Sequence, residues 1–119
     1  MPRLQPFHER GFALACSVVR LYVLLIKSPD MPWHIAQQVL KSGTSVGANL
    51  EEARGAQTRR DLATKFSIAL KEGLETQYWL RLILATHLAP PELISSTLDD
   101  VGELIAILTV TRRRLNQGG

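Results

Sequence analysis

The sequence has very little of the cysteine and histidine chemistry on which many metalloproteins and secreted proteins depend. Cys16 is the only cysteine, which excludes an intrachain disulfide and a zinc site built from cysteines, and it fits a reducing compartment. None of the three histidines, His8, His34 and His87, lies three residues after a glutamate, as the metal-binding pairs of helical bundles require. The sequence therefore predicts no metal site and a cytoplasmic location.

Motifs of catalysis and of nucleotide binding are also missing. Ser42 and Ser45 have no accompanying His and Asp arrangement that would activate a nucleophile. The segment GTSVGAN, residues 43–49, lacks the Lys-Ser/Thr ending of a phosphate-binding loop and falls where a helix is expected. Glu72 and Glu75 alone do not make a metal or acid–base site. We therefore expect no enzymatic activity, no cofactor and no small-molecule substrate.

The chain also lacks a long hydrophobic run of the kind that crosses a membrane. The most apolar segment, FALACSVVRLYVLLI at residues 12–26, is too short and is interrupted by Ser17 and Arg20. Glu9 and Arg10 precede this segment and no small-residue cleavage site follows it, so we expect no signal peptide. No membrane partner is predicted.

What is present is the composition of one globular domain. The 119 residues are 45% hydrophobic and 21% charged, which predicts a single domain over 1–119 that buries its own core. A net charge of +3 and a pI of about 9.4 permit an acidic partner such as nucleic acid. Many ordinary soluble proteins are this basic, so the charge alone does not identify a partner.

Prolines and small-residue loops divide the chain into four helical segments. Pro32 and Pro91 stand where helices begin, and Gly55 is placed to end the second helix. Thr58 and Asp61 form a capping box in front of the third helix. No strand-like alternation competes with this interpretation, so we predict an all-α fold, an antiparallel up-down four-helix bundle. The expected helices cover about 7–27, 33–54, 58–87 and 91–115.

Hydrophobic periodicity supports a bundle and indicates an additional contact. The last helix carries one apolar stripe, formed by Ile94, Leu98, Val101, Ile105 and Leu108. The first helix is apolar around nearly its whole circumference, so it must be buried on more than one face. Because monomers rarely expose an apolar surface of this size, we expect a second copy of the chain to cover it. The sequence thus predicts a homo-oligomer.

Two glycines four residues apart lie within the expected second helix. Gly43 and Gly47 each cost about 1 kcal/mol of helix stability relative to alanine, so their missing side chains must serve a close helix contact. With Ala36 they form a strip of small residues, and Ala69 with Gly73 offers a matching strip on the third helix. We therefore expect the second and third helices to touch there.

A polar stripe runs beside the small residues. Its members on the second helix recur at spacings of three and four, and candidates to meet them lie on the third: Ser42, Ser45, Asn49 and Glu52, then Glu72, Glu75 and Thr76. Two interpretations stay open. The stripe is either a hydrogen-bonded network that sets the register of the helices, within one chain or between subunits, or an ordinary solvated face.

A basic group surrounds the start of the third helix. Arg54, Arg59, Arg60 and Lys65 are candidates for one cluster at an end of the bundle. The helix macrodipole disfavours cations at an amino end, so helix stability does not explain the two central arginines. They are either phosphate contacts or ordinary arginines of a solvated loop. The arginines at 112–114 are weaker evidence for a contact with phosphate, because cations are favoured at the carboxyl end of a helix in any case.

Two long blocks resemble a known family. GTSVGANLEEARGA and FSIALKEGLETQYWLRLIL are similar, in order and spacing, to the four-helix-bundle proteins named for their occurrence in intervening sequences of 23S rRNA genes. The resemblance implies a left-handed antiparallel bundle, a ring-shaped homo-oligomer that is typically pentameric, no established enzymatic activity, and a suspected association with ribosomes or rRNA. It also implies that Asn49, Glu52, Glu72, Glu75 and Thr76 are signature polar residues, which favours the network interpretation.

These observations lead to two functional hypotheses of different kinds. The first is a non-enzymatic, self-assembling bundle that acts as an accessory or scaffold with RNA or a ribonucleoprotein as its partner. The alternative is a structural oligomer that binds protein and makes no contact with nucleic acid. The two differ in the role that they give to the arginines at 54, 59 and 60.

Overall fold

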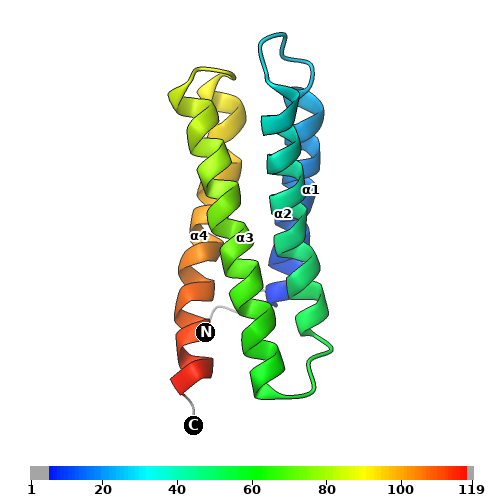
Figure 1. The fold of residues 1–119 in the computed structure, drawn as a ribbon, viewed down its shortest axis with the longest axis vertical. Helices are drawn as coiled ribbons and strands as arrows, with labels where there is room; N and C mark the ends of the chain where they lie inside the picture. The colour runs from blue at the N-terminus through cyan, green and yellow to red at the C-terminus, as the bar shows by residue number, and fades with distance from the viewer. Residues whose placement is uncertain (1–5, 118–119) are drawn as a thin grey trace.

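The computed structural model describes residues 6–117, and the regular secondary structure of this range is helical throughout. The predicted all-helical class is confirmed, and Figure 1 shows the helices packed side by side as a bundle. The first helix ends two residues earlier than expected, and the last continues two residues further. The helices are α1 (Phe7–Leu25), α2 (Trp33–Ala53), α3 (Arg59–Ala85) and α4 (Pro91–Gln117).

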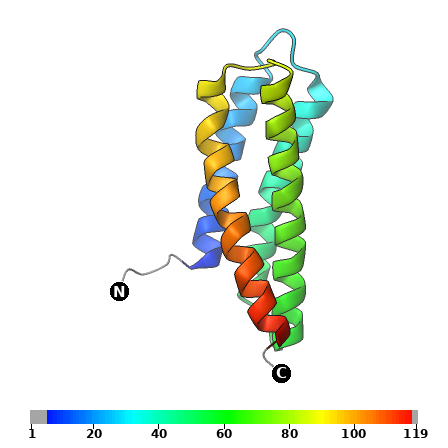
Figure 2. The ribbon, with the colours of Figure 1, turned by 90° about the vertical axis from the view of Figure 1, so that its left-hand side faces the viewer.

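Each helix packs against the next helix of the chain, and α4 also touches α1, although less extensively. Both ribbon views show the α1–α2 and α3–α4 connections at one end of the bundle and the α2–α3 connection at the other (Figures 1 and 2). At the first end, Ser28 Oγ donates a hydrogen bond to the carbonyl oxygen of Leu88, at 3.2 Å. At the other, Arg59 reaches the end of α4. The bundle measures 51 × 29 × 20 Å.

The start of α3 follows the predicted capping pattern. Thr58 has an extended backbone, and its Oγ1 accepts a hydrogen bond from the Asp61 N–H at 3.0 Å. This bond satisfies one of the free donors of the first helical turn, and the acidic side chain of Asp61 is favourable near a helix amino end. Pro91 is the first residue of α4, as its fixed φ predicts.

The ends of α2 and α3 differ in backbone conformation, and Gly55 lies just beyond the end of α2, as predicted. Gly55 does not adopt a positive φ, and its N–H donates to the carbonyl oxygen of Glu52 at 3.0 Å in a tight turn. The left-handed residue is instead His87, with φ of 58°, just after α3. There the N–H of Leu88 donates to the carbonyl oxygen of Ile83 at 3.1 Å. A left-handed turn thus closes α3 without a glycine.

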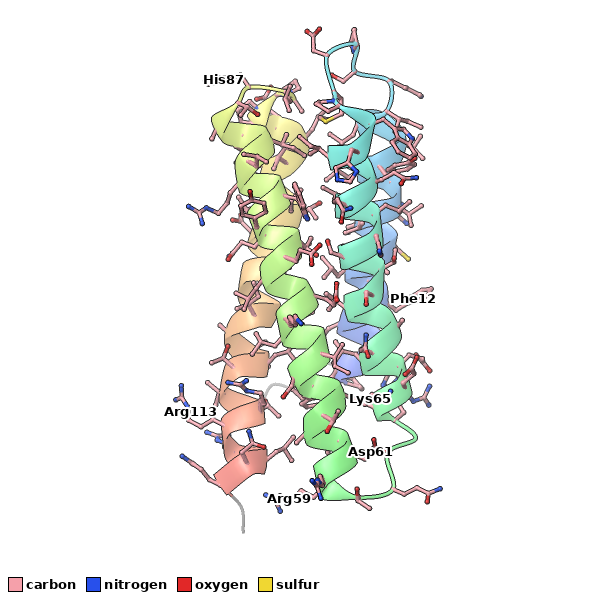
Figure 3. The ribbon with its side chains drawn as sticks, in the orientation of Figure 1. Phe12, Arg59, Asp61, Lys65, His87 and Arg113 are labelled. Atoms are coloured by element: carbon pink, nitrogen blue, oxygen red, sulfur yellow. The ribbon has the colours of Figure 1, made fainter. Side chains whose placement is uncertain are left out.

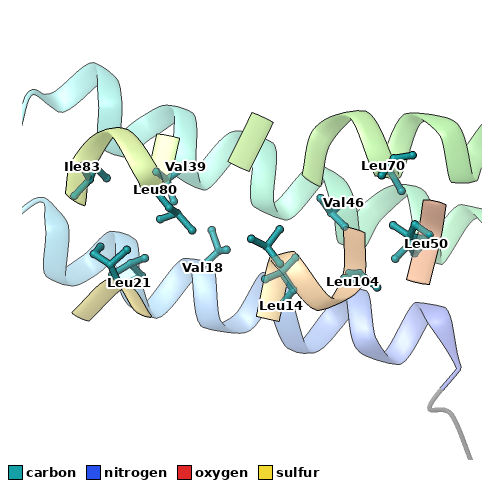
Figure 4. Packing of buried hydrophobic residues seen from close by; sticks show 14 of the residues in the cluster. Leu14, Val18, Leu21, Val39, Val46, Leu50, Leu70, Leu80, Ile83 and Leu104 are labelled. Atoms are coloured by element: carbon teal, nitrogen blue, oxygen red, sulfur yellow. The ribbon is translucent and has the colours of Figure 1, made fainter. Parts of the chain in front are cut away.

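The core is a continuous aliphatic cluster along the bundle axis. Figure 4 shows side chains from all four helices meeting in this cluster. Each fully buried Leu, Ile or Val stabilises the fold by roughly 1.5–3 kcal/mol relative to an exposed one. The predicted stripe of the last helix is confirmed: Ile94, Val101 and Leu108 are fully buried, and its other two members are partly buried against the same cluster.

The glycines of α2 bring this helix close to α1. A Cβ atom built on Gly43 would lie 2.6 Å from Cγ2 of Val18, so that side chain occupies the space that the glycine leaves. A Cβ on Gly47 would lie 2.8 Å from the carbonyl oxygen of Gly11. At this point the two backbones are in direct contact, which only glycine allows.

The prediction that the small-residue strips of α2 and α3 face each other is therefore wrong. Gly43 and Gly47 face α1, while Gly73 of α3 faces α4, where an added Cβ would lie 3.3 Å from Cγ1 of Ile105. Ala69 is fully buried in the core. The spacing of small residues identifies those that share a helix face, but it does not identify the neighbour that the face meets.

Two glycine substitutions test the importance of this close approach. Gly47→Ala should lower the free energy of unfolding by about 2 kcal/mol, because the new methyl group would collide with backbone that cannot rotate away. Gly102→Ala is the control: its nearest neighbour would be Nε2 of Gln77 at 3.9 Å, so better helix propensity should stabilise the protein by up to about 1 kcal/mol. Urea denaturation followed by circular dichroism measures both. Equal effects of the two substitutions would contradict a requirement for glycine at position 47.

Candidate functional site

Arg59 holds the start of α3 against the end of α4. Its Nε donates a hydrogen bond to the carbonyl oxygen of Leu115 at 3.1 Å, and its Nη2 donates to that of Arg114 at 3.5 Å. These carbonyls belong to the carboxyl end of α4, where backbone acceptors are unsatisfied and a cation is favoured. Arg59 is thus unfavourably placed for its own helix and favourably placed for the neighbouring one.

Arg54 and Lys65 are engaged in ion pairs. Arg54 Nη1 lies 2.9 Å from Oε2 of Glu51, and Lys65 Nζ lies 2.7 Å from Oε1 of Glu52. The hydrogen bond to Glu52 and its charge raise the pKa of Lys65 above the ordinary lysine value. Lys65 therefore stays protonated at neutral pH, but an adjacent carboxylate balances its charge. These two predicted contact residues add little net positive charge.

The cations left over at this end are Arg60 and the arginines at 112–114. None of them forms an ion pair within residues 6–117. Figure 3 shows Arg59 and Arg113 at the same end of the bundle. We call this set, Arg60 with the arginines at 112–114, the basic end. From the sequence, the arginines at 112–114 were less informative than those at the start of α3. The expected up-down order nevertheless brings the start of α3 beside the end of α4, and it thus joins the two clusters.

A groove of about 550 Å³ opens at the basic end between α3 and α4. Its apolar lining comes from Ala63, Ile68 and Leu115. Its polar lining comes from two arginines, two hydroxyls and an amide: Arg59, Arg60, Thr64, Ser67 and Asn116. The groove has no signature in the sequence, because its lining comes from two helices that are distant in the chain.

The polar stripe makes fewer links between helices than predicted. Thr76 Oγ1 lies 2.8 Å from Ser42 Oγ, and both side chains are fully buried between α2 and α3. Ser42 Oγ in turn donates to the carbonyl oxygen of Gln38 at 2.7 Å. The Thr76–Ser42 hydrogen bond and the ion pair between Glu52 and Lys65 are the polar side-chain links between α2 and α3 in the described range.

The other predicted members bond within their own helices. Asn49 Nδ2 donates to the carbonyl oxygen of Ser45 at 2.9 Å, and Trp79 Nε1 donates to Glu75 Oε2 at 3.2 Å. The side chain of Glu72 makes no hydrogen bond within residues 6–117, and its backbone oxygen lies 2.8 Å from Thr76 Oγ1. An extended Asn and Glu network within one chain is thus not formed, and a network between subunits stays a prediction.

The outer face of α1 is strongly apolar. Phe12 is 67% exposed, and Val19, Val23 and Ile26 are each exposed by nearly half. With the half-buried Cys16 these residues recur at spacings of four and three, the pattern of a coiled-coil seam. We call them the α1 seam. The core-facing residues of α1 form a separate stripe, so the prediction of a helix that is apolar on more than one face is confirmed.

Residues 6–117 contain no cluster of three or more His, Cys, Asp or Glu side chains arranged to hold a metal ion. Within the same range, no helix combines the length and the apolar character needed to traverse a lipid bilayer. Two surface features of residues 6–117 stand out instead: the basic end with its groove, and the α1 seam.

The chain is similar to proteins of one known family. The model of the family described as 23S rRNA-intervening sequence protein matches residues 7–110. Among solved structures, the chain is similar to a protein of unknown function from the S23 ribosomal protein family of Bacteroides thetaiotaomicron. The two are 36% identical with a TM-score of 0.82, over 89% of this chain and 97% of the other. The search of curated proteins finds no match.

Removing the buried hydroxyl of Thr76 tests the link between α2 and α3. Thr76→Val keeps the side-chain shape and should lower the free energy of unfolding by about 1 kcal/mol through the lost hydrogen bond. Ser42 keeps its bond to Gln38, so no buried partner is orphaned. The control is Thr64→Val at an exposed position of α3, which should change stability by less than about 0.5 kcal/mol. Urea denaturation that gives equal stabilities for the two variants would contradict a structural role for this bond.

Proposed function

Because the chain belongs to the 23S rRNA-intervening sequence protein family, we propose that it is a non-enzymatic, self-assembling bundle that binds RNA or a ribonucleoprotein. The observation that carries the proposal is the basic end. Its arginines belong to the start of α3 and the end of α4, which lie at the same end of the bundle, and they form no ion pair within residues 6–117. We infer a cytoplasmic accessory or scaffold that has no small-molecule substrate.

The contact that we propose is with phosphates. A protein that places arginines against RNA releases condensed counterions, so its affinity falls as the salt concentration rises. Arg60, Arg113 and Arg114 are exposed and have no ion pair in the described range, so they are free to make such contacts. Arg54 and Lys65 are held by glutamates, and Arg59 is held by carbonyl groups. The proposed contact surface therefore differs from the set that the sequence predicted.

Assembly is the second part of the proposal. The α1 seam has the spacing of a helix that packs against another helix, and within residues 6–117 no further element covers α1 on that side. We propose that a second copy covers this seam in a head-to-tail contact. Such a contact, repeated with a rotation that closes after a whole number of copies, generates a ring. The resemblance suggests five left-handed up-down bundles in that ring.

A ring would strengthen weak binding of RNA. Cyclic symmetry carries the basic end of every subunit to the same face of the ring, because each bundle has the same orientation to the symmetry axis. Several modest phosphate contacts on one RNA molecule then act together through their high effective concentration. Assembly and RNA binding use different parts of the bundle, its side and its end.

One charged substitution in the α1 seam tests the assembly. Val19→Glu should convert the oligomer into a monomer of 13.2 kDa, because burying an unpaired carboxylate in an apolar interface is costly. Val110→Glu on α4 is a matched control, since the two valines are 45% and 43% exposed. Light scattering after size exclusion measures the mass of each variant. A wild-type monomer would contradict self-assembly, and dissociation by Val110→Glu alone would move the interface to α4.

Charge reversal at the basic end tests RNA binding. Arg60→Glu should weaken binding to a structured RNA about tenfold and reduce the slope of log affinity against log salt by roughly 1 to 2. Arg81→Glu is the control, because Arg81 is also an exposed arginine of α3 but lies towards the opposite end. Fluorescence anisotropy across a salt series measures both. Equal affinities of the two variants would contradict a contact at the basic end and favour the alternative of a structural oligomer that binds protein.

A further inference from the structure

We propose that the groove at the basic end binds an unpaired nucleotide, so that this surface recognises single-stranded RNA rather than a duplex. This inference rests on the proposed RNA binding and specifies the form of RNA that is bound. It starts from the mixed lining of the groove, in which apolar side chains lie between cationic and hydrogen-bonding ones. A surface that needs only phosphates has no use for an apolar lining.

The apolar lining suits the face of a base. Ala63, Ile68 and Leu115 contribute carbon surface from both α3 and α4. Arg59 adds a guanidinium group whose position is set by its hydrogen bonds to two carbonyl groups of α4. A planar guanidinium that is already immobilised stacks on a base at a low entropic cost. The volume of about 550 Å³ falls within the range of small-ligand pockets and admits one nucleotide.

The polar lining suits the rest of the nucleotide. Arg60 has no ion pair within residues 6–117 and supplies the positive charge for a phosphate group. Ser67 and Asn116 make no side-chain hydrogen bond in that range, so their polar atoms are available to a ribose hydroxyl or a base edge. Thr64 Oγ1 donates to the carbonyl oxygen of Arg60 at 3.0 Å, which leaves its oxygen to accept.

Base pairing would remove this complementarity. In an RNA duplex the bases are stacked inside the helix, and a protein meets mainly phosphates and ribose hydroxyls. The apolar part of the groove would then stay in contact with water. An unpaired nucleotide, in contrast, brings its base to the apolar lining and its phosphate to Arg60 in the same contact.

The test fills the groove without changing charge. The double variant Thr64→Leu/Ser67→Leu places two leucines in the lining, and leucine is a better helix former than threonine or serine. The matched control, Ser95→Leu/Ser96→Leu, introduces two leucines at exposed positions of α4 near the opposite end. Fluorescence anisotropy measures binding of a labelled 12-nucleotide unpaired RNA and of a 12-base-pair RNA duplex.

Filling the groove should weaken binding of the single strand about tenfold, the size of one lost base stack, and leave duplex binding unchanged. The control variant should bind both probes as the wild type does. Wild-type protein that binds RNA with no effect of the groove leucines, or that prefers the duplex, would overturn the nucleotide groove and leave the proposed function standing. Wild-type protein that binds neither probe would overturn the proposed function itself.

A second measurement does not depend on the folding of a variant. Wild-type protein is irradiated with single-stranded RNA that carries 4-thiouridine, and the cross-linked peptide is identified by mass spectrometry. The cross-link should fall within residues 59–68 or 112–117, which contain the lining of the groove. Cross-links confined to other parts of the chain would overturn the assignment.

Discussion

The close approach of α1 and α2 at their glycines is the constraint on which the rest of the bundle depends. Gly47 lies against the backbone of Gly11, and Val18 fills the space beside Gly43. This contact commits the small-residue face of α2 to α1, so α2 meets α3 through a different side, where Ser42 and Thr76 share a buried hydrogen bond. It also sets the rotation of α1. Because one apolar stripe of α1 faces the core, the second stripe faces outwards and has no partner within residues 6–117.

The charge at the basic end follows from which arginines have partners. Arg59 is held by the carbonyl groups at the end of α4, a contact that stabilises the junction of two helices. Glutamates hold Arg54 and Lys65. The net positive charge that a partner would meet therefore comes from Arg60 and from the arginines of α4. A count of basic residues in the sequence gives Arg54, Arg59 and Lys65 the same weight as the arginines of the basic end, and it therefore overestimates the charge that those three offer to a partner.

The two proposed surfaces are compatible because they occupy different parts of an elongated bundle. The α1 seam runs along the side, where a neighbouring subunit fits, and the groove opens at one end. In a ring the grooves would be presented together, and an RNA strand long enough to reach several of them would bind more tightly than one groove allows. In this proposal, the function depends on assembly and on contact with RNA, and it requires no metal centre, in keeping with the absence of a metal-binding cluster from residues 6–117.

The sequence by itself determined the helices, their approximate ends and the apolar character of α1, because these properties depend on local pattern: proline positions, the cap at Thr58 and a hydrophobic period of 3.6 residues. The resemblance of two long blocks also identified the family. Only the tertiary structure decided which neighbour each helix face meets. Gly43 and Gly47 were expected to face α3 but instead face α1, because the spacing of residues defines a shared helix face and not the helix that this face meets. The same holds for the site: the pairing of Lys65 with Glu52, the capping of α4 by Arg59 and the groove beside Arg60 each join residues that only packing brings together.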